Sequence, residues 1–466
     1  MVFSSITFVS IFLPAVLILS LLFHNIRIQN GILLAASLLF YAYGEPVYIF
    51  LLIGSCLFHY VMARILEKKR NRAVLALAVA VSLAALTVFK YLGLLVSIWN
   101  QMLPWHLTDP QIRLPIGISF FTFQQLSYLI DVYRGETKAQ RNPAKLMLYV
   151  CLFPQLIAGP IVKYHEIEKE IDNRSRSMED IAWGIRRFIV GLCKKVLLAN
   201  TLGQAVDGIL AGGISGMNIL SAWLCAVSYM LQIYYDFSGY SDMAIGMGQM
   251  FGFHFRENFQ DPYCAGSIRE FWRRWHISLS TWFRDYLYIP MGGNRKGAGR
   301  TLWNRFFVFL CTGIWHGANL TFLFWGMYHG CFVLLETLLE KRVRSEKKDS
   351  SWIRETASHL YALLVICVGF VIFRANTIGE ASGWIRQMVM GYHFDSSSMC
   401  LLVSRLNPVY LMILLLSLLL LFPQRKSMLE KDIYGKAAWI GSLAGYLLCM
   451  MQLAAGTYNP FIYFQF

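Results

Sequence analysis

The segment that decides the fold of this chain is residues 257–330, which read ENFQDPYCAGSIREFWRRWHISLSTWFRDYLYIPMGGNRKGAGRTLWNRFFVFLCTGIWHGANLTFLFWGMYHG. It contains three of the ten histidines, at positions 276, 316 and 329. Arginine and tryptophan are frequent within it, whereas the sequence on either side is far more apolar. We interpret this polar, aromatic and basic segment as the place where the chemistry of the protein is carried out.

The first of these histidines is expected on an amphipathic helix. Apolar residues recur at intervals of three and four between positions 268 and 283, which predicts one helix. His276 lies at the edge of its apolar face. Histidine titrates near neutral pH, and either ring nitrogen can give or accept a proton. The opposite face carries the charged residues Arg269, Glu270, Arg273 and Arg274.

The second histidine, His316, lies in the run 306–317, which has no charged residue. Burying an ionisable side chain in such a run is costly, so a functional role is the first interpretation. The glycine-rich segment 291–299 allows the chain to turn back between His276 and His316, which could bring the two imidazoles together. A structural histidine, hydrogen-bonded to a neighbour, is the alternative for both.

The third histidine, His329, is expected to face away from His316. On one continuous helix over 306–340, their separation of 13 residues corresponds to a rotation of about 220°, at about 100° per residue. Gly317 and Asn319 are positions where this helix could break.

The composition predicts a polytopic membrane protein. Of the 466 residues 56% are hydrophobic and only 15% are charged, with a mean hydropathy of +0.48, whereas a soluble domain carries about 25% charged residues. The net charge of +15 is typical of basic cytoplasmic loops, and no nucleic-acid-binding module is present. The ten cysteines are scattered without a CxxC pair, which predicts neither a metal site nor a disulfide framework.

The predicted fold class is all-α, with about eleven transmembrane helices. The basic segments 64–72, 340–354 and 424–436 are expected in the cytoplasm, which places both termini outside it. The first apolar run is expected to be a membrane helix and not a cleaved signal peptide, because no basic residue precedes it. The clearest predicted spans are 6–23, 31–43, 47–63, 73–89, 356–373, 406–422 and 437–455.

Three segments in the middle of the chain are harder to assign. Residues 114–135 and 153–163 contain proline and glycine, which predicts broken or re-entrant segments around a central cavity, or else ordinary kinked helices. Residues 181–200 alternate apolar and basic residues. This pattern is typical of an interfacial amphipathic helix, or of a helix end whose basic side chains extend to the headgroups.

Residues 232–242, QIYYDFSGYSD, place two carboxylates in a membrane-adjacent run. Burying Asp236 and Asp242 requires partners. We expect a network of ion pairs and hydrogen bonds that supports the site, although a direct contact with substrate is also possible. The expected partners are Arg269, Arg273, Arg274 and Arg284.

Two long motifs resemble the membrane-bound O-acyltransferase family. WRRWHISLSTWFRDYLYIPMGGNRKG and GIWHGANLTFLFWGMYHG are similar to its branch of alginate O-acetyltransferase membrane subunits and peptidoglycan O-acetyltransferases. The resemblance extends over essentially the whole chain. It implies that His316, in the WHG motif, is catalytic and that His276, in RWHxSLS, is its companion. Further matching motifs are FYAYGEP, LPIGISFFTFQQLSYLIDVYRG, FPQLIAGPIVKY, LQIYYDFSGYSDMAIGMGQMFGF, NFQDPY and NPFIYFQF. Residues expected to support the site or to lie near the substrate are Asp236, Ser238, Asn258, Arg274, Trp315, Asn319 and His329.

The resemblance implies one membrane-embedded acyltransferase domain over residues 1–466. Its expected parts are N-terminal helices in 1–100, a catalytic core in 114–340 and C-terminal helices in 356–466. The implied reaction moves an acyl group, most simply acetyl from acetyl-CoA, from a cytoplasmic thioester to a cell-envelope or secreted polysaccharide, directly or through an exported partner acyltransferase. His316 would be the general base or a transient acyl carrier, and His276 would position the acyl group or stabilise the oxyanion. No metal and no permanently bound cofactor are expected.

Three alternatives remain at this stage. The chain could transfer D-alanine from a carrier protein to teichoic acid, or it could acylate a lipid or a protein. It could also be a transporter whose buried histidines and aspartates relay protons. A transporter is typically built from two similar halves with paired broken helices, and the sequence shows no such symmetry.

Overall fold

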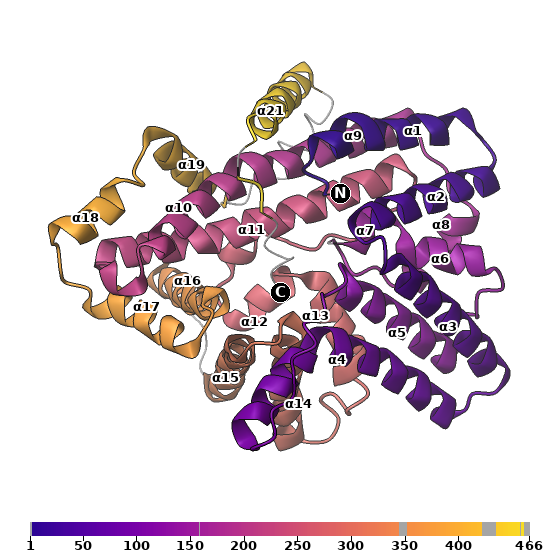
Figure 1. The fold of residues 1–466 in the computed structure, drawn as a ribbon, viewed down its shortest axis with the longest axis horizontal. Helices are drawn as coiled ribbons and strands as arrows, with labels where there is room; N and C mark the ends of the chain where they lie inside the picture. Colours follow the sequence, from indigo (N-terminus) through magenta and orange to yellow (C-terminus); the bar gives the residue numbers. More distant parts are fainter. Residues whose placement is uncertain (1, 158, 344–351, 422–434, 457, 461–466) are drawn as a thin grey trace. The chain divides into compact units, whose positions relative to one another are not determined.

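We describe the protein from a computed structural model, and helices make up 77% of the residues that it describes (Figure 1). The described residues are 2–157, 159–343, 352–421, 435–456 and 458–460, and they contain no β-strand. The chain divides into two compact units. The first is Met1–Gly191 with Tyr240–Glu257, and the second is Leu192–Gly239 with Asn258–Phe466.

The first unit is built on a core of aromatic side chains. The Phe8 ring lies 5.1 Å from that of Phe3 and 5.6 Å from that of Phe40. Such contacts are expected where helices bury their apolar faces against one another. The helices of this unit are η1 (Phe8–Phe12), α1 (Leu13–Leu22), α2 (Ile26–Gly44), α3 (Ile49–Lys68), α4 (Arg72–Met102), α5 (Ile118–Arg134), α6 (Pro143–Cys151), α7 (Phe153–Leu156), α8 (Tyr164–Asp172) and most of α9 (Met178–Cys193).

The second unit contains all three histidines of residues 257–330. Helix α11 begins in this unit and ends in the first. Helix α12 packs against α15 and α16, and α14 packs along α15. The elements are η2 (Lys194–Ala199), α10 (Asn200–Ala211), η3 (Ile214–Gly216), α11 (Ile219–Met250), η4 (Pro262–Cys264), α12 (Ile268–Arg274), α13 (Ile277–Phe283), η5 (Arg284–Tyr288), α14 (Ala298–His316), α15 (Leu320–Val343), α16 (Trp352–Arg374), α17 (Ile378–Met390), α18 (Ser396–Val403), α19 (Pro408–Leu419) and α21 (Lys436–Ala454).

Seven helices in the described part of the chain are long and apolar enough to cross a membrane, or eight if the bent pair α18–α19 is one span. The predicted number of eleven is therefore not confirmed. Five predicted spans coincide with α2, α3, α4, α16 and α21. The first predicted span is a shorter apolar helix over Phe8–Leu22, and the end of the predicted span 406–422 lies outside the described residues.

The prediction of broken helices holds to different degrees for residues 153–163 and residues 114–135. Residues 153–156 form the four-residue helix α7 and residues 159–163 are not helical, so the described part of this segment is broken, as predicted. Residues 118–134 form the unbroken helix α5. Its break comes before the helix, at Gly117, where φ is 76° and a Cβ would lie 2.7 Å from the Leu156 carbonyl.

Lys195 fits neither prediction for residues 181–200, which were an interfacial amphipathic helix or a helix end with basic side chains extended to the headgroups. The residues from Met178 to Ala211 form a continuous run of helix that is a candidate membrane span. The Lys195 side chain is only 2% exposed, and it is held inside by the ion pair with Asp236 described below. A buried carboxylate on α11 therefore draws this ammonium group inward, away from the headgroups.

Glycines bring α14 and α15 into close contact (Figure 1). A Cβ on Gly313 would lie 2.4 Å from the Phe322 carbonyl, and one on Gly326 would lie 2.5 Å from the Phe309 carbonyl. Small residues at these positions let the two backbones meet, as in small-xxx-small helix pairs. This close approach fixes the end of α14, where His316 lies.

Candidate active site

The predicted helix over residues 268–283 is broken at His276, so the prediction of one continuous helix is wrong. His276 lies between α12 and α13 with φ 44° and ψ 55°, in the left-handed region. The Ile277 N–H donates to the Asn258 carbonyl at 3.0 Å, and the Gln260 N–H donates to the Arg274 carbonyl at 2.9 Å. These hydrogen bonds to a neighbouring segment replace those of a continuous helix and hold the break open.

Asn258 sets the orientation of the His276 ring. The Asn258 Oδ1 atom lies 3.2 Å from His276 Nδ1, and it accepts hydrogen bonds from the Ser278 N–H at 3.2 Å and the Ser278 hydroxyl at 2.9 Å. The backbone N–H can only donate, so the Asn258 atom that it meets is the amide oxygen, and His276 carries its proton on Nδ1. Burial lowers the pKa of His276 well below its usual range, so the ring is neutral near pH 7.

The second histidine, His316, is the last residue of α14 and is 7% exposed. Aromatic rings surround it: those of Trp315 and Trp325 lie 5.0 Å away and that of Phe373 lies 5.2 Å away, between centroids. The Trp315 ring also lies 6.1 Å from the ring of His276. The two imidazoles are therefore neighbours of the same indole ring.

The third histidine does not face away from His316, contrary to the expectation for one helix. The chain leaves the helix after His316 and enters α15 at Leu320. The Trp325 ring lies 5.0 Å from His316 and 5.1 Å from His329, so a single indole separates the two histidines. The His329 ring also lies 5.1 Å from Trp272. Residues 317–319 thus break the helix and fold α15 back along α14.

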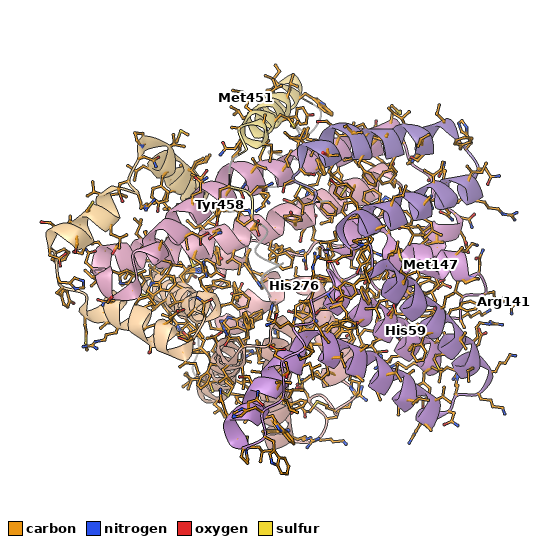
Figure 2. All side chains as sticks on the ribbon, in the orientation of Figure 1. His59, Arg141, Met147, His276, Met451 and Tyr458 are labelled. Carbon is orange, nitrogen blue, oxygen red and sulfur yellow. The ribbon has the colours of Figure 1, made fainter. Side chains whose placement is uncertain are left out.

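Burial distinguishes these histidines from most polar groups of the protein. His276 and His329 are each 1% exposed, and Figure 2 shows His276 among interior side chains. Buried imidazoles packed between aromatic rings are shielded from water, which strengthens their hydrogen bonds and electrostatic interactions.

The carboxylates of α11 are paired, as expected, but their predicted partners are wrong. In the second unit, Asp236 Oδ1 lies 2.6 Å from Lys195 Nζ, and both side chains are almost fully buried. In the first unit, Asp242 pairs with Arg187 at 2.5 Å. The expected arginines have other carboxylates close by in sequence: Arg274 pairs with Glu270 one helical turn away, and Arg284 with the adjacent Asp285.

The ion pair of Asp236 and Lys195 also involves the C-terminal segment. Lys195 donates to the Asn200 side chain at 2.9 Å and to the Pro460 carbonyl. Tyr458 donates its hydroxyl to Asp207 of α10, and Figure 2 shows Tyr458 beside this helix. Asp236 therefore belongs to a buried network that also holds residues 458–460 in place.

The remaining predicted residues have different surroundings. Ser238 is buried, and no hydrogen-bond partner for its hydroxyl is found among the described residues. Asn319 donates to the Asn376 carbonyl at 2.6 Å, and its Oδ1 atom accepts from the Thr321 N–H at 3.3 Å, so it orders the turn after His316. Arg274 is partly exposed at the end of α12 and pairs with Glu270 of the same helix.

A cavity of about 270 Å³, which sequence reasoning did not identify, lies beside Trp272. Trp272, which contacts His329, forms part of its wall. Four arginines line the cavity: Arg269, Arg273, Arg284 and Arg305. They come from three elements, so the helical spacing of basic residues in the sequence could have indicated only the two on α12.

The geometry suits proton transfer and charge stabilisation in a dry site. A neutral imidazole with its proton on Nδ1 offers Nε2 as a hydrogen-bond acceptor and base. The guanidinium groups beside Trp272 suit an anionic group such as phosphate. No group of three or more His, Cys, Asp or Glu residues in the described part of the chain could hold a metal ion.

Comparison with known proteins identifies the class. The family model of the membrane-bound O-acyltransferases matches residues 138–378. "Probable alginate O-acetylase AlgI" of Pseudomonas putida is 42% identical over 82% of this chain and 79% of its own length. The peptidoglycan O-acetyltransferase of Helicobacter pylori is 35% identical over 77% of this chain and 73% of its own length. A teichoic acid D-alanyltransferase of Bacillus subtilis is 26% identical over 55% of this chain and 68% of its own length.

The chain therefore belongs to the membrane-bound O-acyltransferase family. It is an enzyme, an O-acyltransferase, and the several apolar helices of its fold are those of a multi-pass membrane protein. Within this family it resembles the alginate and peptidoglycan O-acetyltransferases over most of its length.

Proposed function

We propose that this enzyme transfers an acetyl group from a cytoplasmic thioester, with acetyl-CoA as the donor, to hydroxyl groups of a cell-envelope or secreted polysaccharide. The transfer is direct or passes through an exported partner acyltransferase. The observation that carries the proposal is the pair of buried histidines, His276 and His316, beside the ring of Trp315. The names of the P. putida and H. pylori relatives support a polysaccharide as the acceptor.

In the proposed reaction, His316 acts as the general base. The acceptor hydroxyl oxygen attacks the thioester carbonyl carbon and forms a C–O bond, while its proton passes to the imidazole. Collapse of the tetrahedral intermediate breaks the C–S bond, and the imidazolium returns the proton to the departing thiolate. Alternatively, His316 takes the acyl group for a short time before it passes to the acceptor.

The geometry of His276 favours one of the two roles expected for it. Its Nδ1–H faces Asn258, so Nε2 is the ring nitrogen with a lone pair that a donor could use. A neutral ring in this state cannot donate from Nε2 to an oxyanion. We therefore propose that His276 positions the acyl group or the attacking hydroxyl, and that oxyanion stabilisation comes from other donors.

The arginine-lined cavity supports an anionic donor. It lies beside Val333, on the half of α15 that leads toward the basic segment 340–354, which we propose is cytoplasmic. The phosphates of acetyl-CoA would bind to its guanidinium groups, with Trp272 between them and His329. In this orientation both chain termini lie outside the cytoplasm.

Transfer of D-alanine to teichoic acid is the second candidate, because the B. subtilis relative carries that name. Its lower identity and shorter match favour acetyl transfer. The two candidates differ in the donor, which is a free coenzyme thioester in one and a carrier-protein thioester in the other.

The test uses purified protein in lipid nanodiscs with radiolabelled acetyl-CoA. Thioester consumption should be lost in His316→Ala and retained in His59→Gln, which changes a buried histidine of the other unit. Equal turnover in wild type and His316→Ala, with both folded, would remove His316 from the mechanism. Turnover only when a D-alanyl carrier protein replaces acetyl-CoA would establish the second candidate.

A further inference from the structure

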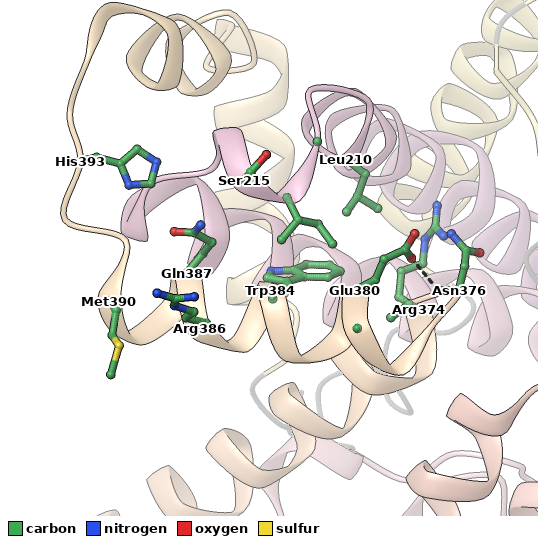
Figure 3. A pocket seen from close by; sticks show the side chains of 15 residues that line it. Leu210, Ser215, Arg374, Asn376, Glu380, Trp384, Arg386, Gln387, Met390 and His393 are labelled. Atoms are coloured by element: carbon green, nitrogen blue, oxygen red, sulfur yellow. Dashed lines mark hydrogen bonds between the residues drawn. The ribbon is translucent and has the colours of Figure 1, made fainter.

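A second and larger cavity, of about 850 Å³, lies in the second unit beside the end of α16 (Figure 3). Its volume is within the range of about 300–1,000 Å³ that proteins use for small ligands. Figure 3 shows the Trp384 ring at its centre, with Arg386 on one side and Glu380 on the other. The residues that line it come from α10, η3, α17, the last residue of α16 and the turns beside these helices. Because the three histidines of residues 257–330 are not among them, the cavity is distinct from the candidate active site.

The helix that ends at this cavity sets its depth in the membrane. Helix α16 is a candidate membrane span of 23 residues, which corresponds to about 35 Å at about 1.5 Å per residue. The hydrocarbon core of a bilayer is about 30 Å thick, so a helix of this length reaches from one headgroup region to the other. Arg374, the last residue of α16, lines the cavity. The cavity therefore lies at the depth of the lipid headgroups, whichever side of the membrane it faces.

Large apolar side chains are exposed beside the cavity. Met390, which lines it, is 66% exposed, and Val389, Tyr392 and Phe394 are each more than half exposed. Neighbouring exposed apolar residues of this kind mark a site of contact with a membrane or a partner. Tyrosine is enriched at the boundary between membrane and water, where its ring meets both phases. The end of α17 and the turn after it are therefore suited to contact lipid.

Two charged side chains of the lining have no partner of opposite charge among the described residues. Arg386 is exposed and forms no ion pair there, and Glu380 accepts a hydrogen bond from the Asn376 N–H at 2.8 Å but pairs with no cation. The remaining arginine, Arg374, is already paired with Asp207 at 2.9 Å. The cavity therefore offers one cation and one carboxylate to a ligand, which favours a zwitterion over an ion of either sign.

The uncharged part of the lining suits hydrocarbon. Leu210 and Ile214 contribute alkyl groups, and Met390 contributes a flexible thioether. The Trp384 ring is fixed because its N–H donates to the Ala222 carbonyl at 3.1 Å, so it presents a flat apolar surface between the two charged side chains (Figure 3). A ligand that matches the whole cavity is therefore amphipathic, with a zwitterionic part and an apolar part.

We infer that this cavity binds a zwitterionic phospholipid of the phosphatidylethanolamine class. The planar guanidinium group of Arg386 donates to the phosphate, and Glu380 accepts from the ammonium group. The acyl chains begin along Leu210 and Ile214 and continue past Met390 into the bilayer. The site requires no assumption about the acyl group that the enzyme transfers.

The experiment counts the lipids bound to the full-length protein by native mass spectrometry. Protein in a mild detergent is titrated with dioleoyl lipids that carry an ethanolamine, choline or glycerol headgroup. Wild type should bind the ethanolamine lipid roughly threefold to tenfold more tightly than the choline lipid, whose quaternary ammonium group cannot donate a hydrogen bond to Glu380. Because all three lipids carry a phosphate, Arg386→Gln should weaken the binding of each about tenfold to a hundredfold.

Two further variants separate headgroup recognition from general contact with lipid. Glu380→Gln should bind the ethanolamine and choline lipids equally. Arg354→Gln removes an exposed arginine from the other end of α16 and should behave as wild type in every titration. Equal binding of the ethanolamine lipid by wild type and Arg386→Gln, or a preference for this lipid that survives in Glu380→Gln, would overturn the inference.

The apolar part of the site is tested with glycerophosphoethanolamine, which has the headgroup without the acyl chains. It should displace the ethanolamine lipid only weakly, because it leaves Leu210 and Ile214 uncovered. Displacement at concentrations similar to those of the lipid would assign the cavity to a soluble phosphodiester and would also overturn the inference.

Discussion

Replacing Asn258 with leucine should impair catalysis without touching either histidine. Asn258 is fully buried, and its Oδ1 atom faces three donors: His276 Nδ1 and the N–H and hydroxyl of Ser278. Leucine has the same number and branching of side-chain heavy atoms, is larger because methyl groups replace the amide, and offers no acceptor. The change therefore removes these hydrogen bonds and adds some crowding at a buried position.

The magnitude follows from the buried donors. Each buried donor left without an acceptor costs about 1–3 kcal/mol. The Ser278 hydroxyl can rotate away, so we count two donors, His276 Nδ1–H and the Ser278 N–H. The free energy of unfolding should therefore fall by roughly 2–6 kcal/mol. A released His276 ring loses its orientation, and misplacement of a reacting group can reduce the rate by about a hundredfold.

The assay compares thioester turnover and thermal unfolding of Asn258→Leu and Asn258→Asp in nanodiscs. Aspartate keeps an acceptor for His276, so its variant should retain more activity than the leucine variant. Its carboxylate favours a protonated ring, so its activity should also shift to higher pH. Wild-type turnover in Asn258→Leu, with an unchanged pH profile, would refute the role given to this hydrogen bond.

Three further predictions concern packing and charge. Gly313→Ala places a Cβ 2.4 Å from a carbonyl of α15 and should reduce both stability and turnover, whereas Gly299→Ala on the same helix has open space and should be tolerated or slightly stabilising in the same assays. Lys195→Met removes the cation beside the buried Asp236 carboxylate and should lower stability by about 3–5 kcal/mol, and the added change Asp236→Leu should recover much of it in thermal unfolding. A hydrogen bond to a carboxylate of α5 raises the pKa of His165, so its stabilisation is complete below the usual pKa of about 6.5 and is lost as pH rises through the raised value. The melting temperature of wild type should therefore fall over this pH range more steeply than that of His165→Gln, and equal slopes would contradict this assignment.

Much of the helical fold could be predicted from apolar runs alone. The runs at 31–43, 47–63 and 73–89 are long, uncharged and bounded by polar residues, and each is found as a helix. The number of spans was harder to predict, because residues 153–163 and the bent pair α18–α19 combine apolar composition with broken backbone. Hydropathy measures composition and does not detect where helical hydrogen bonds stop.

The candidate site shows a similar limit. Periodicity placed His276 on a helix because Trp272, Trp275 and Leu279 keep helical spacing across the break. The break depends on hydrogen bonds that Asn258, 18 residues away in sequence from His276, accepts. Local periodicity carries no information about such a contact, although it correctly predicted that these side chains are buried.

The ion pairs illustrate why partners are difficult to predict from charge alone. Burial of Asp236 required a cation, and this requirement was correct. The nearest basic cluster in sequence supplied the wrong candidates, because Arg274 has a carboxylate of its own four residues away and Arg284 has one at the next residue. Lys195 was assigned to the headgroup region, since its basic neighbours Arg186, Arg187 and Lys194 gave the segment an amphipathic pattern.

The two histidines occupy opposite poles of their helices. His316 ends the 19-residue helix α14, where the aligned peptide dipoles place partial negative charge, and His276 precedes α13, where they place partial positive charge. A cation near the end of a helix is typically stabilised by about 0.3–1 kcal/mol. In the proposed reaction, the backbone field of α14 therefore helps His316 to hold the proton that it takes from the acceptor hydroxyl, whereas His276, which also follows the end of α12, receives opposing contributions from two short helices.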